Sequence, residues 1–399
     1  MFNPDKFAQL NDRYPSYREM RDTTPVLKVE SGPVSTWILT RYDDVALLLR
    51  NPQARVKPLG GAPAGLGNGA AAALFEAQLV LSDSPDHDRL RRLVSPAFTV
   101  QALRPLETWI HEMVNNRVDE LAARGSFDLV NDLASFVPAT TILHILGIPH
   151  SDWEALISRV PAFLYIFSPF PISAEQRDVC ESACQFYIDY FDAIITARWA
   201  NPGDDIVGKL ISVHQQNPEF TRIELIAMLH AFLNAGFETT MSALGAGMFG
   251  MLIQGTPWRQ LCADPTLAGA ALEETLRFDP PIHFMRRFPA EDTTFSGVII
   301  PAGDAVQVCL ASANRDERRF NDPDRIDIHR TDKNHVTFGG GRHFCIGAML
   351  AKLEARTTLE ALARKLPNLE LLDRTPKRQE SLVFHAIKSL NVSTGAPHI

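Results

Sequence analysis

The ten residues Phe338–Gly347 read FGGGRHFCIG, and they place one cysteine, Cys345, at the end of a glycine-rich loop. A helical pattern, AMLAKLEARTTLEALARK, follows at once. Because glycines adopt backbone conformations that a Cβ hinders, such a loop can turn its N–H groups towards the sulfur. Those donors and the positive end of the next helix favour a thiolate over a thiol. With His343 as a further donor or cation, the stretch predicts one thiolate presented to a metal.

Two simpler interpretations of this cysteine compete with that prediction. A lone cysteine is commonly a buried structural thiol, but the surrounding string favours a ligand. A zinc site is disfavoured, because His343 and Cys345 supply only two ligands. The nearest other cysteine is Cys309, and no second Cys/His pair stands at zinc spacing.

The pattern F-x-x-G-x-H-x-C-x-G, filled by Phe338, Gly341, His343, Cys345 and Gly347, resembles the haem-binding loop of the cytochrome P450 family, soluble bacterial (class I) type. In that family a cysteine thiolate is the axial ligand of the haem iron. The resemblance implies haem b with Cys345 as the metal ligand. It also implies that Phe338, His343 and Gly347 belong to the cofactor site.

Composition indicates a globular protein with a sizeable core. The chain has 399 residues, of which 45% are hydrophobic and 22% charged, with a formal net charge of −8. An acidic chain is a poor candidate for nucleic-acid binding. Five cysteines without framework spacing favour a reducing compartment, and hence a cytoplasmic location. No linker or repeat divides residues 1–399, so we expect a single domain.

Neither the N-terminal residues nor the most apolar stretch of the chain indicates a membrane protein. The first residues are polar and resemble neither a signal peptide nor an anchor. The apolar stretch Met228–Ile253 contains Asn234 and Glu238, and a charge at the centre of a bilayer costs roughly 2.5–3.5 kcal/mol. We therefore expect a buried helix there and no membrane span.

The pattern along the chain predicts a mainly α fold with small β-sheets, which together with the resemblance implies the cytochrome P450 fold with a long central helix over the haem. That helix is marked by a capping box, Thr221-x-x-Glu224, and a stop at Gly255. At 1.5 Å per residue it is roughly 50 Å long. The small-residue stretch 56–80 reads as a surface loop. Other helices are expected at about 87–93, 102–124, 134–146, 151–160, 175–199 and 265–278, with short strands at 25–40, 285–310 and 381–393.

Within the long helix, Ala235–Thr240 reads AGFETT and resembles the family's oxygen-activating motif, [A/G]-G-x-[D/E]-T. The resemblance implies that Thr239 hydrogen-bonds dioxygen and that Glu238 relays protons from solvent. Small residues at Ala235 and Gly236 would let the helix pass close to the haem. The alternative is a buried helix in which the threonine bonds back to a carbonyl and the glutamate forms a structural pair.

Haem carries two propionates, so the resemblance also requires cationic donors. His87 and Arg91 form an H-x-x-x-R pattern on one helical face, and Arg287 follows the next motif helix. With His343 they make four converging donors. The alternative for both arginines is a solvated charge.

Glu274 and Arg277 match the family's E-x-x-R pair. Residues three apart are neighbours on a helix, although a surface ion pair of this kind contributes little. In the family a third basic residue joins the pair, and the sequence leaves Arg325 and Arg330 as open alternatives.

The substrate pocket follows only from alignment with the family pattern. Most of its candidates are apolar, as pockets generally are, while Asn234 and His283 either orient a substrate or are satisfied structural groups. The candidates are Val80, Ala231, Asn234, Ala235, His283, Phe384 and the region 163–170.

The resemblance implies a monooxygenase that inserts one oxygen atom from O2 into an apolar organic substrate by hydroxylation or epoxidation. No reductase domain is present, so electrons from NAD(P)H would arrive through a ferredoxin-type donor and its reductase. We expect a monomer. Alternatives are a peroxide-driven peroxygenase of the same fold and a non-catalytic haem-binding or sensor protein. A basic surface near the cysteine loop is expected to meet the donor, formed by Arg89, Arg92, Arg342 and Lys352.

Overall fold

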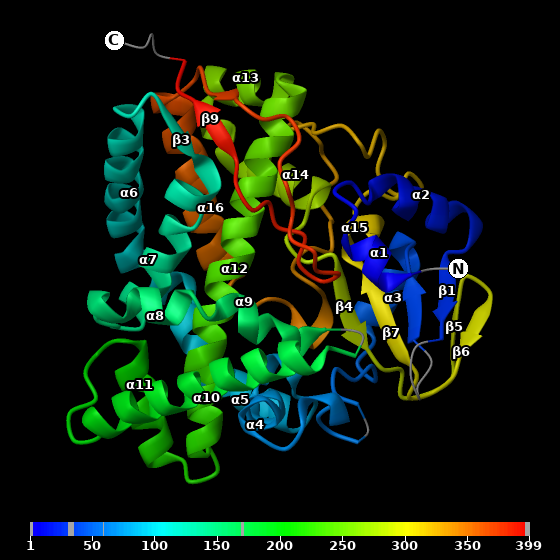
Figure 1. The fold of residues 1–399 in the computed structure, drawn as a ribbon, viewed down its shortest axis with the longest axis vertical. Coiled ribbons are helices and arrows are strands. Elements are labelled where there is room, and N and C mark those ends of the chain that lie inside the picture. Colours follow the sequence, from blue (N-terminus) through cyan, green and yellow to red (C-terminus); the bar gives the residue numbers. More distant parts are fainter. Residues whose placement is uncertain (1–2, 31–35, 59, 169–170, 396–399) are drawn as a thin grey trace.

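A single long helix, α12 (Arg222–Gln254), runs through the centre of the computed structural model, which describes residues 3–30, 36–58, 60–168 and 171–395 (Figure 1). Its ends are where the sequence places them. Thr221 and Glu224 form the capping box in both directions, and Gly255, with φ 73°, ends the helix. Most side chains of α12 are buried, so the interpretation as a core helix is confirmed.

The remaining helices surround α12. The longest are α6, α10 and α16. Several of the shorter ones were not anticipated from the sequence pattern, namely α1, α2, α4, α11, α13 and α15. The α-helices are α1 (Pro4–Ala8), α2 (Tyr14–Thr23), α3 (Tyr42–Arg50), α4 (Ala70–Ala77), α5 (Asp86–Val94), α6 (Val100–Ala122), α7 (Phe136–Ile145), α8 (Trp153–Ile157), α9 (Val160–Phe163), α10 (Ala174–Ala197), α11 (Ile206–Gln216), α13 (Thr256–Ala263), α14 (Ala268–Phe278), α15 (Leu310–Ala313) and α16 (Ala348–Lys365).

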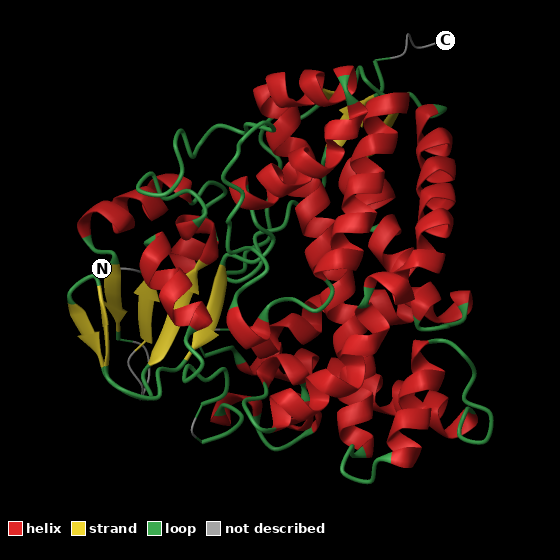
Figure 2. Cartoon of the chain, turned by 180° about the vertical axis from the view of Figure 1, so that it is seen from behind, coloured by secondary structure: helices red, strands yellow, loops and turns green. Residues whose placement is uncertain are grey.

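The strands form small sheets, the largest of which lies to one side of the helices (Figure 2). That sheet has the order β1-β2-β7-β4, with β2 and β7 parallel and the other neighbours antiparallel. A second sheet has the order β3-β9-β8, and β5 pairs with β6. The predicted mainly helical fold with small sheets is confirmed. The strands are β1 (Val26–Val29), β2 (Thr36–Leu39), β3 (Ser126–Asp128), β4 (Phe284–Arg287), β5 (Thr293–Phe295), β6 (Val298–Ile300), β7 (Ala305–Cys309), β8 (Glu370–Leu371) and β9 (Asn391–Ser393).

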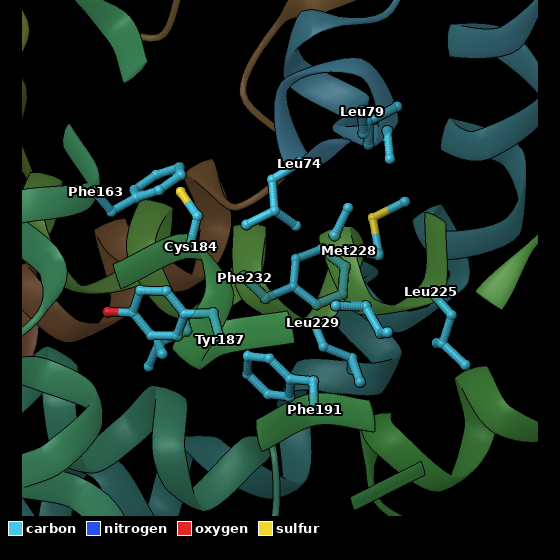
Figure 3. Packing of buried hydrophobic residues seen from close by; sticks show 14 of the residues in the cluster. Leu74, Leu79, Phe163, Cys184, Tyr187, Phe191, Leu225, Met228, Leu229 and Phe232 are labelled. Atoms are coloured by element: carbon cyan, nitrogen blue, oxygen red, sulfur yellow. The ribbon is translucent and has the colours of Figure 1, made fainter. Parts of the chain in front are cut away.

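Two hydrophobic clusters use different parts of α12. The first joins its N-terminal half to α4 and α10, where side chains such as Leu229, Phe232 and Tyr187 pack together (Figure 3). The second joins its C-terminal half to α6, α14 and α16. The middle of α12, which carries the AGFETT motif, therefore lies where the two clusters meet.

The stretch 56–80 is not the plain surface loop that its small residues suggested. It contains α4, in which Ala70, Ala71, Leu74, Phe75 and Ala77 are buried. Its first N–H groups are capped from another helix, because Glu181 of α10 accepts hydrogen bonds from the backbone of Ala70 and Ala71 at 2.6 and 3.0 Å. A cap supplied by a distant segment leaves no local sequence signal.

Within the described residues, no helix combines the length and the apolar character needed to cross a bilayer.

Candidate functional site

The loop before Cys345 depends on glycine at one position. Gly341 has φ 61°, and a Cβ there would lie 2.9 Å from the carbonyl oxygen of Leu49 in α3. The loop closes through a 3.0 Å hydrogen bond from the Cys345 N–H to the Phe338 carbonyl. Gly347 is then the N-cap of α16. The cysteine is thus fixed directly at the start of a helix.

The thiol of Cys345 is accessible, although enough protein surrounds the sulfur for burial to matter. Burial raises its pKa. The backbone N–H groups of Gly347 and Ala348 and the guanidinium of Arg91 act in the opposite direction. Those groups favour the thiolate, as the sequence pattern predicted, and a metal cation at the sulfur would add to them.

Four basic side chains meet beside this loop, as expected. His87 of α5 is buried, and its ring centroid lies 4.1 Å from that of His343. Arg91, one turn further along α5, donates a 2.7 Å hydrogen bond to the Phe344 carbonyl. Arg287 comes from β4 and is also buried. Three separate elements therefore bring these donors together.

This cluster has an excess of donors. Burial lowers the pKa of His343 to about 3, and the charges of Arg287 and Arg91 act in the same direction. Burial also lowers the pKa of Arg287 to about 10, with Asp83 opposing it. The Nε2 atom of His343 and the Nη2 atom of Arg287 have no hydrogen-bond partner among the described residues. Unsatisfied buried donors of this kind fit an anionic ligand.

The middle of α12 presents a narrow accessible face. Ala231, Ala235 and Thr239 keep accessible surface among buried neighbours, and a spacing of four residues places them on one side of the helix. The Thr239 hydroxyl donates a 2.7 Å hydrogen bond to the Ala235 carbonyl. Gly236 serves a different purpose from the one expected, because a Cβ there would press on Ile142 of α7 at 3.3 Å. It allows close packing of two helices.

Glu238 lies next to this face and is only 2% exposed. Burial raises the pKa of its carboxyl group. Its Oε1 atom accepts a 3.0 Å hydrogen bond from the Nε2 atom of Gln379, which comes from the end of the chain and opposes that shift. No sequence pattern predicts Gln379 as the partner of Glu238.

The E-x-x-R pair is buried rather than on the surface. Glu274 and Arg277 are 1% and 0% exposed and form two parallel hydrogen bonds of 2.8 Å. Arg330 completes the group, with its Nε atom 3.0 and 3.1 Å from the two carboxylate oxygens. Arg325 contributes only its backbone carbonyl. The structure therefore selects Arg330 from the two open alternatives.

The residues expected in the substrate pocket differ in how accessible they are. Val80 is 44% exposed and Ala231 is partly accessible. Phe384 is buried, with its ring centroid 6.4 Å from that of Phe167. Asn234 is buried and donates to the His230 carbonyl at 3.1 Å. In the region 163–170, the last two residues lie outside the described part of the chain.

His283 does not lie where a substrate can reach it, which corrects the expectation for this residue. Its side chain is 0% exposed. The Nδ1 atom lies 2.9 Å from the Tyr17 hydroxyl, and the Nε2 atom lies 3.5 Å from a carboxylate oxygen of Asp279. Burial lowers the pKa of His283 to about 4, so the ring is neutral near pH 7. It is a structural group between α2 and β4.

The expected basic surface is smaller than the sequence suggested. Arg92 and Arg342 are exposed. Arg89 instead pairs with a carboxylate at the start of α12, and Lys352 lies 2.7 Å from Glu273. Arg342 has only a distant ion pair, 3.9 Å from Asp88, and Arg92 has none among the described residues, so the charges of these two are the more available of the four.

Comparison with known proteins identifies the family. The profile described as Cytochrome P450 matches residues 6–255 and 259–386. The chain belongs to the cytochrome P450 family and is a cytochrome P450 monooxygenase, an oxidoreductase that works with haem iron.

Individual relatives match over nearly the whole chain. The cytochrome P450 monooxygenase PikC of Streptomyces venezuelae is 34% identical over 90% of this chain and 85% of its own. The mycinamicin IV hydroxylase/epoxidase of Micromonospora griseorubida is 34% identical over 89% and 88%. The crystal structure of P450BioI in complex with hexadec-9Z-enoic acid ligated acyl carrier protein aligns with a TM-score of 0.90 and 27% identity, over 98% of this chain and 99% of that one.

The residues present fit the haem that the family implies. An accessible thiol with backbone N–H groups behind it suits an iron ligand. The unsatisfied donors of His343 and Arg287 suit the two propionates. The small, accessible side chains of Ala235 and Thr239 leave room beside α12.

Replacing Arg287 by methionine is expected to weaken haem binding by about a hundredfold or more, because removing one partner of a buried charge pair costs about 3–5 kcal/mol. The measurement is the rate of haem transfer to excess apomyoglobin. Arg286→Met is the matched control, since successive strand residues point to opposite faces. Equal haem loss from both variants would contradict the assignment of Arg287.

Proposed function

We propose that this protein is a haem-thiolate monooxygenase that hydroxylates or epoxidises an apolar organic substrate with electrons delivered by a separate protein. The observation that carries the proposal is the accessible Cys345 thiol, which has backbone N–H groups on one side and, on the other, the donors of His343 and Arg287 that lack a partner among the described residues. The two named relatives, a monooxygenase and a hydroxylase/epoxidase, support the reaction class.

In this proposal Cys345 holds the iron, and His87, Arg91, Arg287 and His343 hold the propionates. The haem would supply activation of O2 and cleavage of its O–O bond. Burial keeps the histidine rings neutral near pH 7, so they act as hydrogen-bond donors. The arginines provide the positive charge.

The remaining chemistry belongs to α12. The Thr239 hydroxyl already donates to the Ala235 carbonyl, so its oxygen is left to accept a hydrogen bond from another group. Glu238 is a buried carboxyl group whose raised pKa favours holding a proton nearer to neutral pH than an exposed carboxyl would. We propose that Glu238 supplies protons and that Thr239 directs them towards the place that O2 would occupy.

In this proposal, different residues contact the substrate and the electron donor. Val80, Ala231 and Phe384 supply apolar surface for the substrate. A ferredoxin-type donor and its reductase would carry electrons from NAD(P)H, with Arg92 and Arg342 as the available positive charges for an acidic donor. The five unpaired cysteines fit a reducing, cytoplasmic setting.

The test combines the purified haem-loaded protein with small apolar compounds that shift its Soret band, under three conditions. With NADPH and a surrogate ferredoxin pair, we expect oxygenated product. Product formed with hydrogen peroxide alone, and not with the redox pair, would instead identify a peroxygenase. Absence of product in both would leave a binding or sensor protein.

Replacing Thr239 by alanine is expected to uncouple the reaction. Substrate binding and NAD(P)H consumption should persist, while product per NAD(P)H falls about tenfold or more, within the range that positioned proton donors contribute. The missing electrons should appear as hydrogen peroxide, measured in parallel. Thr239→Ser keeps the hydroxyl and is expected to stay coupled. A fully coupled Thr239→Ala enzyme would remove this residue from the proton route.

A further inference from the structure

Among the described residues, the Glu238 side chain has one hydrogen-bond partner, and that partner lies far away in the sequence. Gln379 donates from Nε2 to the Oε1 atom of Glu238 at 3.0 Å, across a separation of 141 residues. The Oε2 atom receives no hydrogen bond from the described residues. One carboxylate oxygen is therefore fixed, and the other remains available to exchange a proton.

Gln379 belongs to a segment that is held in place by backbone hydrogen bonds. Residues 377–388, here called the C-terminal hairpin, are joined by backbone hydrogen bonds from Gln379 to Ala386 at 2.8 Å and from Lys388 to Lys377 at 2.9 Å. Between the two arms, the backbones of Arg378 and Ile387 form an antiparallel bridge. The side chain of Gln379 is thus presented to α12 from a short but regular piece of backbone.

The base of the hairpin is held by a buried ion pair. Arg378 donates from Nη2 to Asp279 at 2.6 Å and from Nη1 to the His385 carbonyl at 2.8 Å. The other carboxylate oxygen of Asp279 accepts a 2.7 Å hydrogen bond from the Tyr14 hydroxyl. Because Arg378 immediately precedes Gln379, this clamp fixes the position from which Gln379 reaches Glu238.

We propose that Gln379 is a positioning residue for proton delivery: its amide holds the Glu238 carboxyl in one orientation and stabilises its ionised form, so that the buried acid can release its proton in each turnover. This inference rests on the proposed role of Glu238. An N–H donor to a carboxylate favours the charged form, whereas burial opposes it. Gln379 offsets part of the burial, so that Glu238 can both hold and release a proton.

No charged side chain among the described residues stabilises the ionised form of Glu238 in place of Gln379. The influences on the pKa of Glu238 are burial and the Gln379 amide. Other buried titratable side chains lie on the surrounding elements but do not act on it. These are Tyr187 of α10, Glu354 of α16, His230 of α12 itself and, at the base of the hairpin, Asp279, His283 and His385; Arg378 at the same place is partly buried.

The test uses two substitutions with opposite expected signs. Gln379→Leu keeps the volume and removes the donor, so the titration of Glu238 should move to higher pH. Gln379→Lys places a positive charge beside the carboxylate, so the titration should move to lower pH; the position is only partly buried, which lets the ammonium reach water. Opposite shifts cannot arise from a general loosening of the fold.

Two readouts follow the shift in the haem-loaded protein. Infrared titration in D2O follows the carboxyl C=O band that disappears in Glu238→Gln. The pH dependence of product per NAD(P)H should shift in the same direction as that band. Lys377→Ala, an exposed change on the same hairpin, is the control and should leave both unchanged.

The two proposals fail in different ways. If Glu238→Gln leaves the pH profile of product formation unchanged, the proton-delivery role of Glu238 fails, whatever Gln379 does. If the infrared band of Glu238 titrates at the same pH in wild type, Gln379→Leu and Gln379→Lys, the inference about Gln379 is overturned, even with Glu238 essential.

Discussion

Replacing Cys345 by histidine is expected to abolish the strongly red-shifted Soret band of the reduced, CO-bound protein and, with it, monooxygenase turnover. The thiolate pushes electron density onto the iron and favours O–O cleavage, which a neutral imidazole does much less. The N–H groups of Gly347 and Ala348 are set to stabilise an anion at this position, and a histidine would not use them. The measurement is the CO difference spectrum alongside product formation.

The matched control is Cys262→Ala. Cys262 is a partly exposed cysteine on α13 whose Sγ atom lies 3.7 Å from the Pro367 carbonyl. Its loss should leave the spectrum and turnover unchanged. A red-shifted band that survives in Cys345→His would mean that another residue holds the iron.

Replacing Glu274 by alanine is expected to cost about 3–5 kcal/mol of folding free energy, because it leaves two buried guanidinium groups without their carboxylate. Arg277 is 0% exposed, and the Arg330 side chain is 9% exposed. Total stabilities of about 5–15 kcal/mol make this a large fraction. The measurement is the midpoint of urea unfolding together with the yield of haem-loaded protein.

The adjacent carboxylate provides the control. Glu273 pairs with Lys352 at 2.7 Å and with His335 at 3.2 Å, but its side chain and that of Lys352 both reach the surface. Glu273→Ala should therefore cost only about 1 kcal/mol. Equal losses of folding free energy from the two alanine variants would show that burial does not determine how much the group of Glu274, Arg277 and Arg330 stabilises the fold.

Local signals made the central features predictable from sequence. The capping box at Thr221 and the glycine at 255 fixed both ends of α12 to within a residue. The cysteine loop was equally predictable from its glycines. Gly341 is required there because its φ is positive and the backbone of Leu49 lies close to it. In each case the cause lies within a few residues of its effect.

Other features depend on residues far away in sequence and had no local sign. Glu181 caps α4 across 110 and 111 residues, so residues 56–80 read as a loop. Gln379 reaches Glu238 from another segment altogether. Arg325 and Arg330 lie in the same irregular stretch, and only folding decides which guanidinium meets Glu274. The expectation of a single domain over residues 1–399 stays a prediction.

The two ends of the described chain are bound to each other, and this constrains the order of folding. Arg13 donates hydrogen bonds to the carbonyls of Ser381 and Leu382, across 368 and 369 residues. Contacts of such separation pay the largest loop-closure entropy and slow folding. They cannot form during synthesis until Ser381 and Leu382 have emerged from the ribosome. The N-terminal helices must therefore wait, incompletely packed, for the segment that completes their environment.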